Sequence, residues 1–357
     1  MKTQFARKFG FVVLAVLLLA GLAFSPSGFR SQASAASQAK DLPDYLVTTG
    51  SEYLAATRDW TAKELAAAVP YPLPEYESTG DALTADVFAG ATGARGVAPG
   101  FSPEKTISLT SSWQEMAGSA ITALPLPYPL AFTVNKVDVF SSSKKYPFST
   151  VGVLFFKQAG RSYRCSASVI GMNAIVTAGH CVSNGAGVWS TNGVFVPAYA
   201  NGVAPAGQWK VAQWLTFTAW HTGADLARDW GWGRITPKTT GSIGAKTGFL
   251  GYAWNWSRYQ HWWALGYPAE APYDGLWMWT CQSAYGYDSP FGTEPKPMGI
   301  GCDMTGGCSG GPWILQFATG NYVNSVNSHR TVGFPLELFG PYSDTAVADT
   351  HAYARGW

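Results

Sequence analysis

Residues 306–312 form a glycine-rich run, Gly-Gly-Cys-Ser-Gly-Gly-Pro, with a single serine at its centre. A serine hydroxyl attacks a carbonyl only when a base removes its proton and when donors stabilise the resulting oxyanion. Glycines on both sides of Ser309 let the backbone turn tightly, so that two amide groups can converge on one point. We therefore predict that Ser309 is a nucleophile and that the amides of Gly307 and Ser309 form an oxyanion hole.

The candidate base is His180, one of only five histidines, which lies in the run Thr177-Ala-Gly-His-Cys181. A strand is expected just before this histidine. If Cys165 and Cys181 pair, the bond ties two adjacent strands at the point where the base must stay fixed. A structural or metal-binding histidine is the alternative interpretation. No two of the five cysteines form a C-x-x-C pair, which disfavours a structural zinc site.

These two motifs resemble the histidine and serine motifs of the chymotrypsin-like (trypsin-type) serine peptidases. The similarity covers the spacing from Cys165 to Cys181, the T-A-G-H-C sequence and the G-x-S-G-G-P core, and residues 131–357 are similar to that family in length and motif order. The missing Asp before the serine and the Asp-Trp-Gly pattern at 229–231 are closer to the bacterial glutamyl-endopeptidase (V8-like) branch. The resemblance implies an all-β fold of two packed six-stranded antiparallel barrels, with the active site between them.

The resemblance also implies a carboxylate between His180 and Ser309, which fixes the histidine tautomer and stabilises the imidazolium. Asp229 precedes Trp-Gly, as in the bacterial branch, and an expected strand follows it. Asp225 precedes Leu-Ala, which is closer to the form found in trypsins. We choose Asp229 as the third member of the triad and keep Asp225 as the alternative.

Cys308 occupies the position where trypsins carry an aspartate that binds the new N-terminal ammonium after activation. A cysteine cannot form that ion pair, so removal of a propeptide must act differently here, by unblocking the cleft or through another contact of the new terminus. Cys302 could pair with Cys281 or with Cys308. We favour a disulfide between Cys281 and Cys302. Because the number of cysteines is odd, one of them must remain unpaired within the chain.

Substrate specificity is less clearly encoded. The resemblance implies that the strand at residues 322–329 pairs with the substrate backbone and forms one wall of the primary pocket, with Val326, Asn327 and Ser328 as contacts. Glutamate-specific relatives carry a histidine on this strand, where this chain has Asn327. His329 lies two residues further on the same strand face, and packing is the alternative explanation for it.

Short apolar runs separated by turn residues predict that residues 131–357 are mainly β. The expected strands span residues 151–156, 163–170, 174–177, 210–217, 230–235, 248–252, 262–267, 276–285, 312–317 and 322–328.

The N-terminal residues have the pattern of a segment that is removed during secretion. Three basic residues precede the uncharged, almost wholly apolar residues 9–24, and Ala33-Ser34-Ala35 has the form of a signal-peptidase site. We predict a signal peptide at residues 1–35. The apolar run is short for a spanning helix, which needs about 20 residues, so a retained membrane anchor is the less favoured alternative.

Residues 36–130 read as a propeptide or N-terminal extension. Thr61 and Glu64 form a capping-box pattern that predicts the start of a helix, and Pro70, Pro72 and Pro74 prevent its continuation. A proline-rich linker at residues 124–129 precedes the expected protease domain, residues 131–357. An ordinary N-terminal interaction domain is the alternative.

The composition limits the partners. A net charge of +2 is too small to suggest nucleic acid or an anionic membrane. Five cysteines fit an oxidising compartment. We therefore expect a secreted, extracellular, monomeric serine endopeptidase that acts on proteins or peptides, without a metal or cofactor and without stable membrane association after signal cleavage. The rival hypotheses are a secreted binding protein on the same fold and an esterase or amidase with the same triad.

Overall fold

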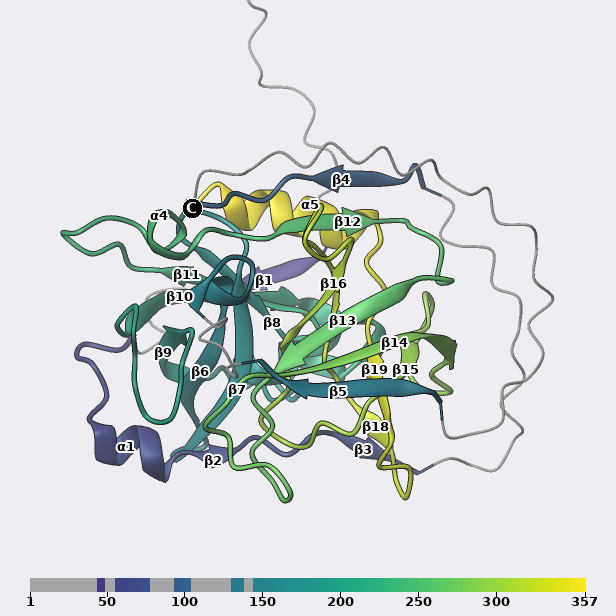
Figure 1. Ribbon diagram of the computed structural model, residues 1–357, viewed down its shortest axis with the longest axis horizontal. Helices are drawn as coiled ribbons and strands as arrows, with labels where there is room; N and C mark the ends of the chain where they lie inside the picture. Colours follow the sequence, from purple (N-terminus) through teal and green to yellow (C-terminus); the bar gives the residue numbers. More distant parts are fainter. Residues whose placement is uncertain (1–43, 49–54, 78–92, 104–129, 138–143) are drawn as a thin grey trace, which may run out of the picture. The chain divides into compact units, whose positions relative to one another are not determined.

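The computed structural model describes residues 44–48, 55–77, 93–103, 130–137 and 144–357, all of which belong to one compact unit (Figure 1). The predicted signal peptide and the linker at residues 124–129 lie outside the described residues. Within the described ranges, no helix has both the length and the apolar character needed to cross a membrane.

The first half of the protease region is a closed antiparallel barrel of six strands. Each strand pairs with its neighbours in the order β10-β11-β8-β7-β6-β9, and β9 pairs back to β10 to close the circle. The strands are β6 (Val151–Gln158), β7 (Arg161–Val169), β8 (Ala174–Thr177), β9 (Thr191–Pro197), β10 (Trp209–Phe217) and β11 (Gly231–Ile235).

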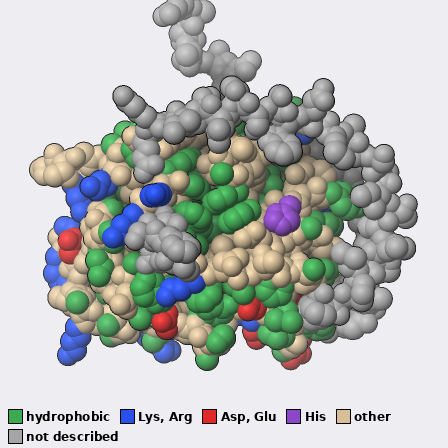
Figure 2. All heavy atoms as spheres, viewed as in Figure 1, with side chains coloured by type: hydrophobic (Ala, Val, Ile, Leu, Met, Phe, Trp, Pro, Cys, Tyr) green, Lys and Arg blue, Asp and Glu red, His purple; other side chains and the backbone are tan. Residues whose placement is uncertain are grey.

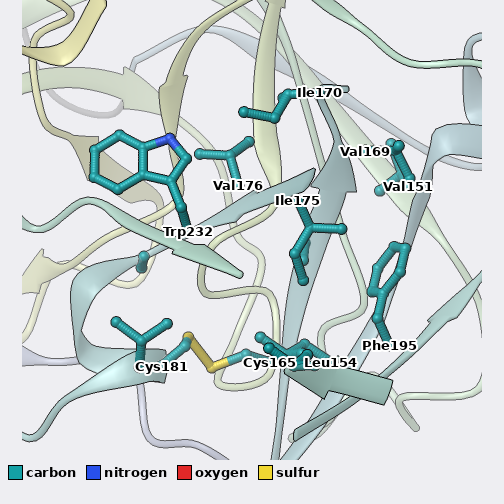
Figure 3. Packing of buried hydrophobic residues seen from close by; sticks show 14 of the residues in the cluster. Val151, Leu154, Cys165, Val169, Ile170, Ile175, Val176, Cys181, Phe195 and Trp232 are labelled. Atoms are coloured by element: carbon teal, nitrogen blue, oxygen red, sulfur yellow. A yellow bond between two sulfur atoms is a disulfide. The ribbon is translucent and has the colours of Figure 1, made fainter. Parts of the chain in front are cut away.

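The barrel interior is apolar and close-packed. Leu154, Ile175, Phe195 and Trp232 are fully buried and lie together in Figure 3, beside the disulfide bond. Almost every residue of β6 and β8 is buried, which explains why these strands read as continuous apolar runs rather than as alternating patterns.

The second half of the protease region is a larger sheet. Its strands follow the order β19-β15-β14-β13-β16-β17-β12-β4, and β5 pairs with β14 at the side. The bounds are β4 (Gly96–Ala98), β5 (Phe132–Lys136), β12 (Gly251–Trp254), β13 (His261–Gly266), β14 (Trp279–Asp288), β15 (Met298–Gly301), β16 (Pro312–Leu315), β17 (Tyr322–Val326) and β19 (Glu337–Gly340). The chain after β17 approaches β19 again through a single bridge between His329 and Phe339.

The expectation of an all-β, chymotrypsin-like architecture is confirmed, although the second half is a nine-stranded sheet in which β19 also contacts the chain after β17 through that bridge. Within residues 131–357 five strands were missed, namely β5, β9, β15, β18 (Arg330–Thr331) and β19. Strands β15 and β19 have four residues each and contain glycine, which weakens their strand pattern. The C-terminal helix α5 (Thr345–Arg355) was also missed.

The chain before residue 130 contributes elements to this unit. Helix α1 (Ala62–Ala67) begins at the expected capping box, with the Thr61 side chain accepting from the Glu64 amide. Strand β1 (Tyr45–Val47) pairs with β10, β2 (Val69–Pro70) with β7, and β3 (Glu75–Tyr76) with β18 (Arg330–Thr331). Figure 1 shows α1, β2 and β3 following one another along the lower side. The described residues on the two sides of residue 130 therefore pack together in one compact unit.

Charged side chains are sparse on the face shown in Figure 2, as the low content of charged residues, 13%, leads one to expect. Most of that face is formed by neutral polar and hydrophobic groups. Beneath the surface, the described residues form two buried apolar clusters.

The disulfide between Cys165 and Cys181 links residues separated by 16 positions. Replacing both cysteines by alanine should lower the free energy of unfolding by about 3 kcal/mol, because the unfolded chain regains loop entropy. Urea unfolding followed by tryptophan fluorescence measures this change. Met172→Ala, at an exposed position, is the control and should leave stability almost unchanged. A double variant as stable as the parent protein would contradict the expectation.

Candidate active site

His180 lies in the short helix α2 (Gly179–Val182), directly after strand β8. The adjacent Cys181 is bonded to Cys165 on β7, as expected. Position 179 has no room for a side chain, because a Cβ there would lie 2.7 Å from the Trp220 ring and 3.0 Å from a carboxylate oxygen of Asp229. The disulfide and this close approach fix the imidazole against the barrel.

Asp229 is fully buried and holds His180 by two hydrogen bonds. Its Oδ1 accepts from the His180 backbone amide at 2.8 Å, and its Oδ2 lies 2.9 Å from His180 Nδ1. The Ser328 hydroxyl donates to the same Oδ2 at 2.6 Å. Burial alone would raise the pKa of Asp229, but the attraction of His180 and these hydrogen bonds outweigh it and hold the pKa below its ordinary value.

The alternative carboxylate, Asp225, has a different role in the structure. Its Oδ1 accepts from the Ala227 amide at 3.1 Å and so caps a short 3-10 helix. The Thr293 hydroxyl donates to its other oxygen at 2.5 Å. The structure thus brings Asp229, and not Asp225, to His180.

Ser309 lies at the centre of the predicted glycine turn and is fully buried. Gly310 has a φ of +78°, and a Cβ there would lie 2.0 Å from the Thr177 hydroxyl. Gly307 has a φ of +94°, a conformation that favours glycine. The glycines are therefore required by the turn. Among the described residues, neither Ser309 Oγ nor His180 Nε2 has a hydrogen-bond partner.

Neutral side chains hold the loop around Ser309. The Asn327 side-chain amide donates to the Cys308 carbonyl at 2.9 Å, and the Asn327 carbonyl accepts from the Gly310 amide at 2.8 Å. The Ser166 hydroxyl donates to the Gly307 carbonyl at 2.9 Å. These bonds hold the loop although residue 308 is a cysteine and not an aspartate.

Cys308 is the free thiol among the described residues, because the second disulfide joins Cys281 to Cys302. Burial raises the pKa of Cys308 to about 12, so the group stays a neutral thiol. The sets of His, Cys and Asp side chains close enough to share a metal ion in the described ranges all include disulfide-bonded cysteines, which carry no thiolate to bind one.

The three expected substrate contacts, Val326, Asn327 and Ser328, have side chains that pack within the protein. Val326 is buried in a core cluster, and the Asn327 side chain contacts Trp313 and the Cys308 carbonyl rather than the cleft. Ser328 contacts Asp229. Their role as contacts to a substrate backbone therefore stays a prediction. The backbone that pairs with another segment lies further along, at Arg330 and Val332.

His329 is a packed residue rather than an open ligand for a carboxylate. Its Nε2 lies 2.9 Å from the Ser289 hydroxyl and its Nδ1 lies 2.9 Å from the Ser328 hydroxyl. The ring stacks on Phe339 with centroids 5.0 Å apart. Burial lowers the pKa of His329 to about 3, so the imidazole is neutral near pH 7.

Sequence reasoning missed one part of the site, residues 69–76, which we call the cleft segment. The Gly307 amide donates to the Tyr71 carbonyl at 3.1 Å, and the Tyr71 ring lies 5.3 Å from that of His180. The three alternating prolines, at 70, 72 and 74, were a usable signal, since proline and the residue before it favour extended backbone. Nothing in the sequence indicated where this extended segment would lie.

Comparisons with known proteins identify the family. Residues 139–227 match the trypsin family model. The structure of protease Anisep from Arthrobacter nicotinovorans has 31% identity and a TM-score of 0.56, and the match covers 58% of this chain and 96% of that protein. A thermostable serine protease, AL20, from an extremophilic microorganism has 32% identity and a TM-score of 0.55, covering 58% of this chain and 97% of that protein.

The similarity to the glutamyl-endopeptidase branch is more distant. A Glu endopeptidase structure has 18% identity and a TM-score of 0.51 over 63% of this chain and 97% of that protein, which supports the fold alone. No match was found among curated protein sequences. The identity over almost the whole of protease Anisep shows that this chain belongs to the trypsin family of chymotrypsin-like serine proteases and is a serine endopeptidase.

Proposed function

We propose that this chain is a secreted endopeptidase that cleaves proteins or peptides through a triad of Ser309, His180 and Asp229. The observation that carries the proposal is the double contact of one buried carboxylate with His180, at 2.8 Å to its amide and 2.9 Å to its ring. A fully buried carboxylate is costly unless it is paired, so this arrangement favours a histidine that can become positively charged.

The roles of the three residues follow from their positions. Asp229 fixes the tautomer in which His180 Nδ1 carries the proton, so Nε2 is free to take the proton of Ser309. The serine oxygen then attacks the peptide carbonyl, and the amides of Gly307 and Ser309 stabilise the oxyanion. His180 returns the proton to the leaving amine, and water hydrolyses the acyl-enzyme. Each of these steps uses groups of the chain, the substrate and water.

The proposal includes a zymogen, with residues 36–130 as the propeptide. Strands β1 and β4 lie at the ends of their sheets, β2 is added only to β7, and β3 pairs only with β18. Removing these strands would therefore break no pairing between the central strands of either sheet. This peripheral position supports a segment that can be cut away while the protease remains folded.

Secretion is supported by the predicted signal peptide and by the two disulfides. Disulfides persist in oxidising compartments and are rare in the cytosol. We also propose that the processed protein is a monomer without stable membrane association.

A serine-reactive fluorophosphonate should label the processed protein at Ser309, and Ser309→Ala should abolish labelling and lower kcat by a factor of about 10⁵–10⁶. The reason is that no other group in the site can form the acyl-enzyme. Sequencing the N-terminus of the labelled species should place it near residue 130. Peptidase activity near the parent level in Ser309→Ala would contradict the proposal, and absence of labelling in every form would favour a binding protein on this fold.

Asp229→Asn should lower kcat of the processed enzyme by about 10⁴-fold, because an amide at this position favours the wrong tautomer of His180. Asp225→Asn is the matched control, since it makes the same chemical change in a nearby carboxylate that does not contact His180. Steady-state hydrolysis of a chromogenic peptide measures both. Equal losses in the two variants would remove Asp229 from the triad.

A further inference from the structure

We propose that the active-site cleft is a binding site for an extended, proline-containing peptide, and that the chain's own cleft segment (residues 69–76, Val-Pro-Tyr-Pro-Leu-Pro-Glu-Tyr) occupies it as an inhibitor before processing. The inference rests on the proposed roles of His180 and Ser309. It names the ligand that keeps their site closed.

The backbone of the cleft segment is bound on both sides of the nucleophile. On one side the Tyr71 amide donates to the Arg164 carbonyl at 2.9 Å. On the other side the amides of Arg330 and Val332 donate to the carbonyls of Pro74 and Tyr76, at 3.0 and 2.9 Å. Both strand pairings are parallel, so the segment crosses the site in one direction.

At the centre of the site the segment contacts the groups needed for catalysis. The Tyr71 carbonyl accepts from the Gly307 amide at 3.1 Å, which is one of the two proposed oxyanion donors. The Tyr71 ring lies against the His180 ring, and its hydroxyl donates to the Gln158 side chain at 2.9 Å. With the segment in place, His180 is only 2% exposed and Ser309 is 0% exposed. A substrate therefore has no access to either residue.

Side chains on the other half of the segment add specific contacts. Leu73 is 5% exposed and belongs to the apolar cluster that includes Met304 and Cys308, beside the nucleophile. Glu75 pairs with Arg330 at 3.4 Å. The Tyr76 ring packs edge-on against His329, with centroids 5.8 Å apart. The ligand class is thus an extended peptide with aromatic, apolar and acidic side chains between prolines.

Two observations indicate that the segment is held as an inhibitor rather than as a substrate. Ser309 Oγ makes no hydrogen bond to His180, so the nucleophile is not activated. The Tyr71 ring fills the space beside the imidazole.

The test compares fluorophosphonate labelling rates of the unprocessed full-length chain, followed as the full-size band. Leu73→Asp should raise the labelling rate about tenfold or more, because a carboxylate is disfavoured in the apolar position and releases the segment. Val203→Asp, which makes a comparable change at an exposed position, should leave the rate unchanged. An unprocessed parent chain that labels as fast as the processed enzyme would overturn the proposal while leaving the serine protease assignment intact.

A second measurement does not depend on the folding of a variant. A synthetic peptide of residues 69–76 should inhibit the processed enzyme competitively and remain uncleaved, and the same peptide with Leu73→Asp should bind about tenfold or more weakly. In the full chain the segment is tethered to the protease, which gives it a high effective concentration that the free peptide lacks. Inhibition by the peptide is therefore measured up to about millimolar concentrations. Absence of competition over that range, or cleavage after Tyr71, would overturn the proposal. Failure of every form to label would overturn the proposed function and this inference together.

Discussion

The buried carboxylate of Asp229 is the constraint on which the rest of the site depends. A fully buried charge is stable only when it is paired and hydrogen-bonded, and Asp229 meets this requirement through His180 and Ser328. His180 comes from the first barrel and Ser328 from the chain after β17, so one carboxylate joins the two halves of the fold. The packing of the two halves thereby also fixes the orientation of the proposed base.

The conformation of the loop at Ser309 requires glycines on both sides of the serine. Gly310 lies so close to Thr177 that no side chain fits, and Gly307 takes a positive φ. Asn327 and Ser166 then hold the carbonyls of Cys308 and Gly307. These hydrogen bonds, together with one from the Gly306 amide to the Glu270 carboxylate, hold the loop without an ion pair to a new N-terminus. The closed state is explained instead by the segment that covers the loop.

The sequence predicted five of the six strands of the first barrel and the two motifs that the fold brings to one site, because these depend on short apolar runs and on short glycine-rich or cysteine-bearing patterns. Asp229 could be preferred over Asp225 by its pattern, but only the contact with His180 distinguishes them. The burial of Val326 and Asn327 could not be predicted, since it depends on how the end of β17 packs against β16 and the loop at Ser309. The cleft segment could not be placed because its contacts with Gly307 and Arg330 link residues more than 200 positions apart in the chain.

The most direct measurement is a crystal structure of the processed enzyme after reaction with a fluorophosphonate. We expect a phosphonyl group on Ser309, with one of its oxygens bound to the Gly307 amide in place of the Tyr71 carbonyl. We also expect residues 69–76 to be absent from the cleft and His180 to remain bonded to Asp229. An adduct on another residue, or a modified Ser309 with the cleft segment still in position, would contradict this account of the site.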